Sequence, residues 1–546
     1  MADYLQKKLD VVQRLSEVGI ALSAERDSAR LMELILRSAK ELTNADGGTL
    51  YTCNENELVF EIMLTDSLGI YLGGASGSEV GLPNIPLYDA KGAPSEKTVA
   101  ARAAVTGETV NIPDAYDATG YDFSGTRVFD KKTGYRSKSF LSVPMRSHDD
   151  EVIGVLQLIN ANNDSGEVVE FSIEHQEFVE SLASQAAIAM TNKRLLDEQR
   201  KLFEAFIELI AGAIDDKSPY TGNHCRRVPE LTLMLADAAA ATTEGPLKDF
   251  SMSEEDRYEL KIAGWLHDCG KVTTPEYVVD KSTKLETIFD RIKLVGTRFE
   301  VLKRDAKIRM LERILSEHGV DVSKETEASR EYQSQARRLD EERDFLRHAN
   351  IGAESMSEED INRIRRIGGY RWRNENGEDA AFLTDDEVKN LTVRHGTLTS
   401  EERDIINDHI VATIKMLESL PYPNYLKRVP EFAGGHHERM DGKGYPRGLQ
   451  REEMSVQARA MGIADVFEAL TADDRPYKKA MRLSEALKIL GGMKLKNHVD
   501  PDLFDVFVRE KVYLDYARRF LEPEQIDEVN HDQIPGYGRP PEELAS

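Results

Sequence analysis

The sequence has few cysteines and no long apolar run. Its three cysteines, Cys53, Cys225 and Cys269, form no C-x-x-C pair and are too few for a disulfide framework. A reducing compartment is therefore indicated. Without a stretch of about 18 apolar residues the sequence predicts no membrane-spanning helix, and the polar N-terminus does not resemble a signal peptide. We expect a cytoplasmic protein.

Basic residues are also in deficit. Lys and Arg number 71 against 97 Asp and Glu, which gives a formal net charge of −26. Because this charge repels phosphate backbones, polymeric DNA or RNA is not expected as a partner. A small anionic ligand stays compatible with the sequence if metal ions concentrate positive charge locally. The length of 546 residues corresponds to about three to five domain-sized units.

The N-terminal part changes from helical to strand-like patterning. Residues 1–43 have apolar positions at three- and four-residue steps, which predicts helix, and the glycines after Asp46 end it. From residue 49 to 160, short apolar runs alternate with Gly, Pro, Asn and Asp, which predicts strands and turns. Residues 140–145 and 152–159 form the strongest strand pair, with a turn at Asp149 and Asp150. This order indicates an α+β sensory domain.

Residues 172–214 predict one long helix, because they contain almost no Gly or Pro and keep a helical apolar period. A helix of about 40 residues generally needs a partner. Two interpretations are open: a helix that packs on its own domain, or a signalling helix that pairs in a dimer and joins two domains. We favour the dimeric helix.

The C-terminal part predicts helices over residues 215–285 and 400–520, separated by a charged insert at 286–398. The densely charged run at 330–347 is typical of a solvated helical face, and a regulatory role is the alternative. The tail from residue 535 is rich in proline, which favours disorder.

Residues of metal-ligand type recur in apolar settings within this part. His267 and Asp268 close an apolar helical segment, and imidazole nitrogen with carboxylate oxygen suits a borderline divalent metal. A single histidine of this kind is more often a structural residue. Asp465 is a sharper signal, because its apolar neighbours predict burial and a buried carboxylate needs a cation or several donors. The other candidates in such settings are His224, His409, His436 and His437.

Three motifs, taken in their order along the chain, are more specific than these single residues. Residues 267–271 (HDCGK) resemble the H-D-x-G-K element of the HD phosphohydrolase superfamily. Residues 436–446 (HHERMDGKGYP) resemble the H-H-E-x-x-D-G-x-G-Y-P element of its HD-GYP branch, and residues 463–471 with 475–477 complete the pattern. The resemblance covers residues 203–525 apart from the insert.

The resemblance implies an all-α bundle with two divalent metal ions, usually iron or manganese. It assigns His224, His267, Asp268 and Asp465 to one ion, and Asp268 as a bridge to a second ion held by His409, His436 and His437. Two neighbouring cations lower the pKa of a bridging water and neutralise the charge of a phosphodiester. Asp268 and Lys271 would be catalytic. The implied substrate-binding residues are Lys271, Asp441, Gly444, Tyr445, Pro446, Arg475 and Lys478. For residues 444–446 a tight turn without a substrate role is the alternative.

Two departures from the family pattern bear on the site. Some members carry Glu four residues before the first ligand histidine, where it supports a third metal, whereas this sequence has Tyr220. We therefore expect two metals. The segment 472–475 is one residue longer than usual, which leaves the phosphate role of Arg475 open.

The N-terminal part resembles a GAF domain over residues 28–190, on the evidence of residues 139–145 and 154–160. Cyclic-nucleotide-binding members carry an Asn-Lys…Phe…Asp-Glu signature, and Asn160 and Phe171 fit it. Ala161 replaces the lysine, however, and His175 begins the segment where an acidic pair would stand, which argues against nucleotide binding. Cys53 carries no haem or redox signature and is expected to be a buried small side chain.

The expected architecture is a GAF-type α+β domain joined by a long helix to an HD-GYP helical bundle. Its parts are an N-terminal helix (1–27), the GAF-like domain (28–190), a linker helix (191–214), the HD-GYP domain (215–525) with insert 286–398, and a tail (526–546). The expected function is hydrolysis of cyclic di-GMP to pGpG, with GMP as the alternative end product, under control of the GAF domain and of signalling partners. Two alternatives stay open: hydrolysis of another cyclic dinucleotide such as 3′,3′-cGAMP, and a non-catalytic, cyclic di-GMP-responsive interaction module.

Overall fold

The computed structural model describes residues 2–89, 91–217, 223–318, 327–352, 355–472 and 480–538, with side chains from residue 13 onward. Contacts within the chain divide it into unit 1, Met1–Leu202, and unit 2, Phe203–Ser546. Among the described residues, none of the helices combines the length and apolar content that crossing a membrane requires.

Unit 1 is built on an antiparallel sheet in the order β3-β2-β1-β7-β6-β5. The expected strand pair is confirmed as β6 and β7, and Asp150 turns between them with φ +64°. The two short strands β4 and β8 pair with β2 and β7. The strands are β1 (Ala45–Asn54), β2 (Glu57–Thr65), β3 (Ile70–Gly73), β4 (Ile85–Pro86), β5 (Val110–Ile112), β6 (Phe140–Arg146), β7 (Val152–Asn162) and β8 (Val168–Val169).

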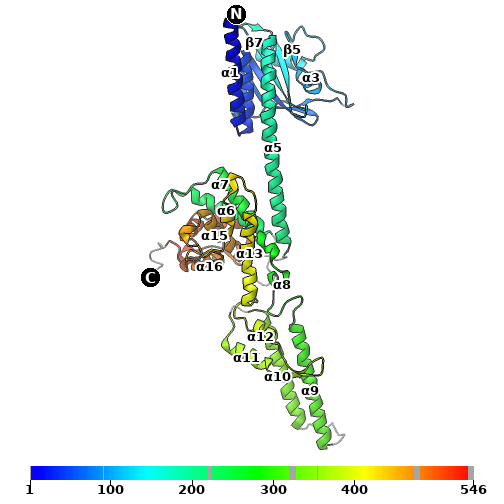
Figure 1. The fold of residues 1–546 in the computed structure, drawn as a ribbon, viewed down its shortest axis with the longest axis vertical. Helices are drawn as coiled ribbons and strands as arrows, with labels where there is room; N and C mark the ends of the chain where they lie inside the picture. Colours follow the sequence, from blue (N-terminus) through cyan, green and yellow to red (C-terminus); the bar gives the residue numbers. More distant parts are fainter. Residues whose placement is uncertain are drawn as a thin grey trace. The chain divides into compact units, whose positions relative to one another are not determined.

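Alternation along β7 gives this sheet two buried faces. Leu156 and Leu158 lie in one core, and Val155 lies in the other, as the two-residue period of a strand requires. The first core is covered by α1 (Ala2–Ala24), α2 (Ser28–Thr43) and the start of α5 (Ile173–Lys217). The second is covered by α3 (Val99–Thr106), with α4 (Ser124–Thr133) following in the chain. Figure 1 shows α1 and α5 on one side of the sheet and α3 on the other.

Helix α5 contributes to the cores of both units. Near its start Leu182 and Ala186 are buried in unit 1, whereas Ile207, Ala211 and Ile214 are buried in unit 2. The last three recur at four- and three-residue steps and so form one helical face. The part of the helix that we expected as a linker up to residue 214 therefore packs into unit 2 from residue 203 onward.

Unit 2 has a helical core, as expected from the sequence. Its larger helices are α6 (His224–Ala240), α7 (Glu254–Leu266), α13 (Ser400–Glu418), α14 (Val429–Gly434), α15 (Val456–Thr471), α16 (Leu483–Leu495), α17 (Pro501–Arg509) and α18 (Val512–Phe520). Short helical turns connect them: η2 (Cys269–Thr273), α8 (Glu276–Val279), η3 (Asn424–Leu426), η4 (Arg451–Glu453), η5 (Pro523–Gln525) and η6 (His531–Gln533). Helices α6, α7 and α15 contribute heavily to one apolar core.

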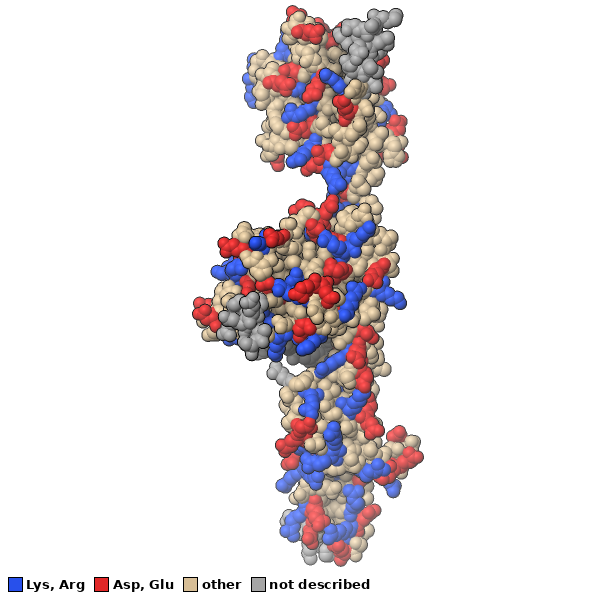
Figure 2. All heavy atoms as spheres, turned by 60° about the vertical axis from the view of Figure 1, so that its left-hand side comes forward, with Lys and Arg blue, Asp and Glu red and all other residues tan. Residues whose placement is uncertain are grey.

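The charged insert folds around its own apolar core, which includes Phe299, Leu346 and Phe382. Its elements are α9 (Ile292–His318), α10 (Glu327–Asn350), α11 (Glu358–Gly368), the hairpin β9 (Arg371–Arg373) and β10 (Asp379–Ala381), and α12 (Asp385–Leu391). Ion pairs Lys303–Asp340 and Arg313–Glu331 join α9 to α10 in antiparallel order. Figure 2 shows both signs of charge interspersed on the surface, which is typical of solvated helices.

The close approach of α6 and α7 depends on Gly264. A Cβ at this position would lie 3.0 Å from Pro229 Cα. Because that neighbour is backbone, we expect Gly264→Ala to lower the free energy of unfolding by roughly 1–3 kcal/mol. Thermal unfolding followed by circular dichroism measures the change.

Gly492→Ala on α16 is the matched control. A Cβ there meets nothing within 4 Å, so this variant should gain roughly 0.5–1 kcal/mol from the better helix propensity of alanine. A Gly264→Ala variant as stable as the wild type would contradict the packing argument.

Candidate metal centre

The seven residues that the sequence indicated as metal ligands come together in unit 2. His224 begins α6, His267 and Asp268 follow α7, and Asp465 lies on α15. His409 lies on α13, and His436 and His437 follow α14. Two groups result, each with ligand-type atoms within 4.8 Å of one another: Asp268, His409, His436 and His437 in one, and His224, His267 and Asp465 in the other. All seven side chains are buried or half-buried.

Hydrogen bonds at Nδ1 aim the Nε2 atoms of four of these histidines at one another. A carbonyl or carboxylate oxygen only accepts, so Nδ1 must carry a proton, and Nε2 is the ring nitrogen left to face the centre. Three histidines donate to the carbonyl three residues earlier: His267 to Gly264 (2.7 Å), His409 to Ile406 (2.5 Å) and His436 to Ala433 (2.6 Å). The fourth, His224, donates to Glu468 Oε2 at 2.5 Å.

The resulting spacing fits ligands that share a metal ion. His224 Nε2 lies 3.3 Å from His267 Nε2, and His409 Nε2 lies 3.2 Å from His437 Nε2. Two ring nitrogens this close repel unless a proton or a metal ion lies between them. Two ligands each about 2.1 Å from one ion and at right angles are about 3.0 Å apart, close to the observed distances.

Two buried atoms of the seven candidate ligands also lack the hydrogen bonds that burial demands. His436 Nε2 and Asp268 Oδ1 have no hydrogen-bond partner in the described part of the chain. Buried polar atoms are nearly always satisfied. A coordinated cation would satisfy both atoms, so the residues present fit a metal.

Asp268 faces both groups. Its Oδ2 lies 3.2 Å from His224 Nε2 and 3.3 Å from His267 Nε2, and its Oδ1 lies 3.2 Å from His409 Nε2. Burial acts to raise the pKa of this carboxyl, but the charges of Lys271 and His267 outweigh it and hold the pKa well below its usual range. An ionised carboxylate with one oxygen toward each group suits a bridging ligand.

Gly270 brings this carboxylate against α13. A Cβ on residue 270 would lie 2.0 Å from the carbonyl oxygen of His409, and the Gly270 amide donates to Thr413 Oγ1 at 2.9 Å. Only glycine allows such an approach. The H-D-x-G turn therefore places Asp268 beside His409 because its fourth residue has no side chain.

Lys271, expected to face the substrate phosphate, pairs with Asp268. Its Nζ lies 2.6 Å from Asp268 Oδ2, and its side chain is 28% exposed. The ammonium group therefore lies at the centre, and part of the lysine side chain is open to solvent.

The other histidine pKa values follow from burial and charge. Burial lowers the pKa of His436 well below its usual value and that of His437 to about 4. Burial also disfavours the charged form of His224, but the charge of Glu468 and hydrogen bonds to Asp268 and Asp465 raise its pKa well above the usual value. The imidazoles of His436 and His437 are therefore neutral at neutral pH.

Glu468 is a residue of the centre that the sequence analysis missed. Its buried carboxylate accepts from His224 Nδ1 and, at 2.7 Å, from Arg227 Nε. Burial opposes ionisation, but the charges of His224 and Arg227 outweigh it and lower the pKa to about 2. The available signal was spacing, because Glu468 lies three residues after Asp465 and so on the same face of α15.

The loop after His437 folds back onto that histidine. The ring of Tyr445 stacks on the imidazole of His437 with centroids 4.8 Å apart and planes at 22°. A Cβ on Gly444 would lie 2.4 Å from Arg439 N, so this return requires glycine. Asp441, expected to bind substrate, pairs with Arg439 at 2.7 Å and accepts from the amide of Lys443 at 3.1 Å, so it braces the loop.

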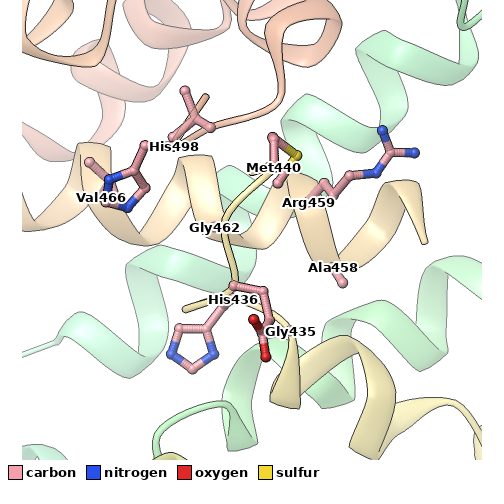
Figure 3. A pocket seen from close by; sticks show the side chains of 10 residues that line it. Gly435, His436, Met440, Ala458, Arg459, Gly462, Val466 and His498 are labelled. Carbon is pink, nitrogen blue, oxygen red and sulfur yellow. The ribbon is translucent and has the colours of Figure 1, made fainter. Parts of the chain in front are cut away.

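A small pocket borders this region between α15 and the segment after α14. Its lining includes His436, Arg459, Val466 and His498 (Figure 3). Arg459 pairs with Asp500, so its charge is already balanced. Of the seven candidate ligands the lining contains His436 alone, so this pocket is not the space between the ligand groups. Arg475, Lys478 and Tyr220 lie outside the described residues.

Comparison with protein families identifies the domains. Residues 27–190 match the GAF domain family, and residues 221–351 and 385–503 match two families described as HD domain. The chain is thus a GAF–HD protein, with a GAF domain followed by an HD domain.

Comparison with individual proteins gives partial matches. The chain is 48% identical over 81 residues to the 3'3'-cGAMP-specific phosphodiesterase 1 of Vibrio cholerae, covering 15% of this chain and 19% of that protein. It is 32% identical over 151 residues to the cyclic di-GMP phosphodiesterase of Thermotoga maritima, covering 27% and 40%. The chain thus spans two fifths or less of the length of these relatives.

Among solved structures, the GAF domain of a phosphoenolpyruvate-protein phosphotransferase from Coxiella burnetii aligns with a TM-score of 0.27 and 16% identity. The alignment covers 35% of this chain and 98% of that one.

Substitution of Glu468 tests whether this carboxylate orients the His224 ring for metal binding. Glu468→Gln keeps the shape but weakens the bond that fixes His224, so we expect metal affinity to fall roughly 10- to 100-fold. Titration of metal-free protein with Mn²⁺ measures it. Glu452→Gln, an exposed position on η4, is the control and should bind as the wild type does. Equal affinity in both variants would argue against the role of Glu468.

Proposed function

We propose that the protein is a metal-dependent phosphodiesterase of the HD-GYP branch that hydrolyses cyclic di-GMP to pGpG; GMP, from a second hydrolysis, is the alternative end product. The observation that carries the proposal is the convergence of seven metal-ligand side chains in two groups with Asp268 facing both. No single one of these residues would justify it.

Two divalent ions are proposed, iron or manganese. His224, His267, Asp268 and Asp465 would hold one, and Asp268, His409, His436 and His437 the other. Mixed imidazole and carboxylate donors suit such ions. When bound, the pair would supply an activated water and neutralise phosphodiester charge.

The chain's own side chains would bind and orient the substrate. Lys271, which lies beside Asp268 and has a partly exposed side chain, would contact a phosphate oxygen and would hold a proton near the reacting group. The loop of Gly444, Tyr445 and Pro446 would border the substrate beside His437. Asp441 would contribute to substrate binding indirectly, by holding that loop in place. Arg475 and Lys478 are proposed to contact the second phosphate.

Cyclic di-GMP is the substrate we favour, and a second candidate has specific support. The relative with 48% identity carries a name that specifies 3'3'-cGAMP, whereas the match named for cyclic di-GMP is longer at 151 residues. Both names describe cyclic dinucleotides. A third possibility, a non-catalytic interaction module, loses support because no candidate ligand of the binuclear set is missing.

Turnover by the metal-loaded protein tests the proposal. We expect wild-type protein with iron or manganese to convert cyclic di-GMP to pGpG in a chromatographic assay, with about two metal ions per chain by elemental analysis. A parallel assay with 3'3'-cGAMP decides between the substrates.

The double variant His267→Ala/Asp268→Ala should lose both the metal and the turnover. His148→Ala, an exposed histidine paired with Asp149, is the control and should keep both. Absence of turnover with either dinucleotide, while a known phosphodiesterase works in the same assay, would refute the enzymatic proposal. Metal retained without turnover would favour the interaction module.

We further propose a homodimer formed through α5. Its exposed apolar side chains Ile188, Leu195, Leu202 and Leu209 recur every seven residues. Leu209 is 70% exposed, which is costly for a helix face without a partner. A seven-residue repeat of this kind is the pattern of a coiled coil. Through this helix the GAF domain would modulate the HD domain.

Charge placed in the repeat tests the dimer. Leu195→Glu/Leu202→Glu should convert a dimer into monomers in analytical ultracentrifugation, because four carboxylates would be buried in the pair. Arg194→Glu/Lys201→Glu has the same spacing one residue earlier and should leave the dimer intact. A wild-type monomer at micromolar concentration would exclude this pairing.

A further inference from the structure

The last turn of α5 contacts both backbone segments that lead into the metal centre. Asp215 is buried, and its two carboxylate oxygens accept from the amide of Cys225 at 3.3 and 3.2 Å. Cys225 directly follows His224 at the start of α6. A carboxylate at a helix N-terminus stabilises both the first amides and the helix dipole. Asp215 therefore fixes the turn that carries His224.

Lys217, the last residue of α5, holds the other segment. Its Nζ donates to the carbonyl oxygens of Lys271, Val272 and Thr274 at 3.1, 2.6 and 2.6 Å. These carbonyls belong to η2 and the residue after it, directly following Asp268. A lysine ammonium has three protons, so all are used on this one turn.

The two contacts act on residues that matter to both metal groups. His224 belongs to one group, and Asp268 faces both. Lys271, whose carbonyl Lys217 binds, also pairs through its own side chain with Asp268. A displacement of the last turn of α5 would therefore disturb a ligand of one ion and the bridge between the two.

The same turn is anchored in the core of unit 2. Ile214 lies one residue before Asp215 and three before Lys217, and it is buried with Ala211 and Ile207. Movement of α5 along or about its axis would shift these apolar side chains and the two polar contacts together. Because packed cores have discrete arrangements, a helix movement of this kind is transmitted and not absorbed locally.

We propose that Asp215 and Lys217 are positioning residues, and that through them the end of α5 sets the metal affinity of the centre. The inference rests on the proposed metal site. It extends the proposed function by naming what α5 would control, which is metal retention at His224 and Asp268, and which two side chains transmit the control.

Two variants and two matched controls test it in the full-length chain. Lys217→Met keeps most of the length of the side chain but removes its three donors, and Asp215→Asn removes the charge that holds the Cys225 amide. Lys201→Met and Asp216→Asn make the same changes at exposed positions on the same helix. Each protein is stripped with chelator and titrated with Mn²⁺, and amide hydrogen exchange over residues 267–275 is measured without metal.

We expect both test variants to bind Mn²⁺ roughly 10- to 100-fold more weakly than the wild type. Amide exchange over residues 267–275 should accelerate in Lys217→Met, because this segment opens more often without the three hydrogen bonds from Lys217. Both controls should match the wild type. Test variants with wild-type affinity and wild-type exchange would overturn the proposal.

A fallback variant and a parallel assay separate this proposal from misfolding and from the proposed reaction. If Lys217→Met does not fold, as judged by thermal unfolding, Asp215→Asn decides the question by its Mn²⁺ affinity. Cyclic dinucleotide turnover is measured in parallel. A wild-type protein without turnover refutes the proposed reaction, whereas Mn²⁺ affinity and exchange still test the positioning role by themselves.

Discussion

The centre of unit 2 is organised around the buried carboxylate of Asp268. This buried carboxylate has three histidine Nε2 atoms within 3.3 Å, and two pairs of Nε2 atoms approach to 3.3 and 3.2 Å. Backbone carbonyls and Glu468 hold the Nδ1 protons of four of the histidines, so those rings cannot turn to avoid one another. A metal ion between these nitrogens would relieve their repulsion and satisfy the buried oxygen together.

The helices around the centre hold these side chains in place through short-range contacts. Each of three histidines bonds the carbonyl three residues earlier, a contact that a helix or helical turn offers automatically. Gly270 allows the turn after Asp268 to touch α13, and Gly444 allows the tyrosine loop to return over His437. The apolar core supplies the low dielectric in which these few polar contacts determine geometry.

The seven candidate ligands could be singled out from the sequence because their chemistry lies in the residue types and their short-range order. A histidine–aspartate pair, a double histidine and a carboxylate among apolar neighbours are visible in the sequence. Glu468, the pairing of Lys271 with Asp268 and the separate core of the insert were not, since each depends on which side chains meet after folding. The strand pair β6–β7 was predictable from alternation, whereas the burial of Ile207 to Ile214 in unit 2 reflects which core the helix reaches.

With a net charge of −26 on the chain, the proposed metal site would affect substrate binding as well as the reaction. An acidic protein repels an anionic dinucleotide unless positive charge is concentrated where the ligand binds. Lys271 alone supplies little, because Asp268 already balances it. Bound cations would therefore control substrate affinity as well as turnover, and metal retention becomes an effective point of control. The contacts of Asp215 and Lys217 with the segments that carry His224 and Asp268 lie where such control would act.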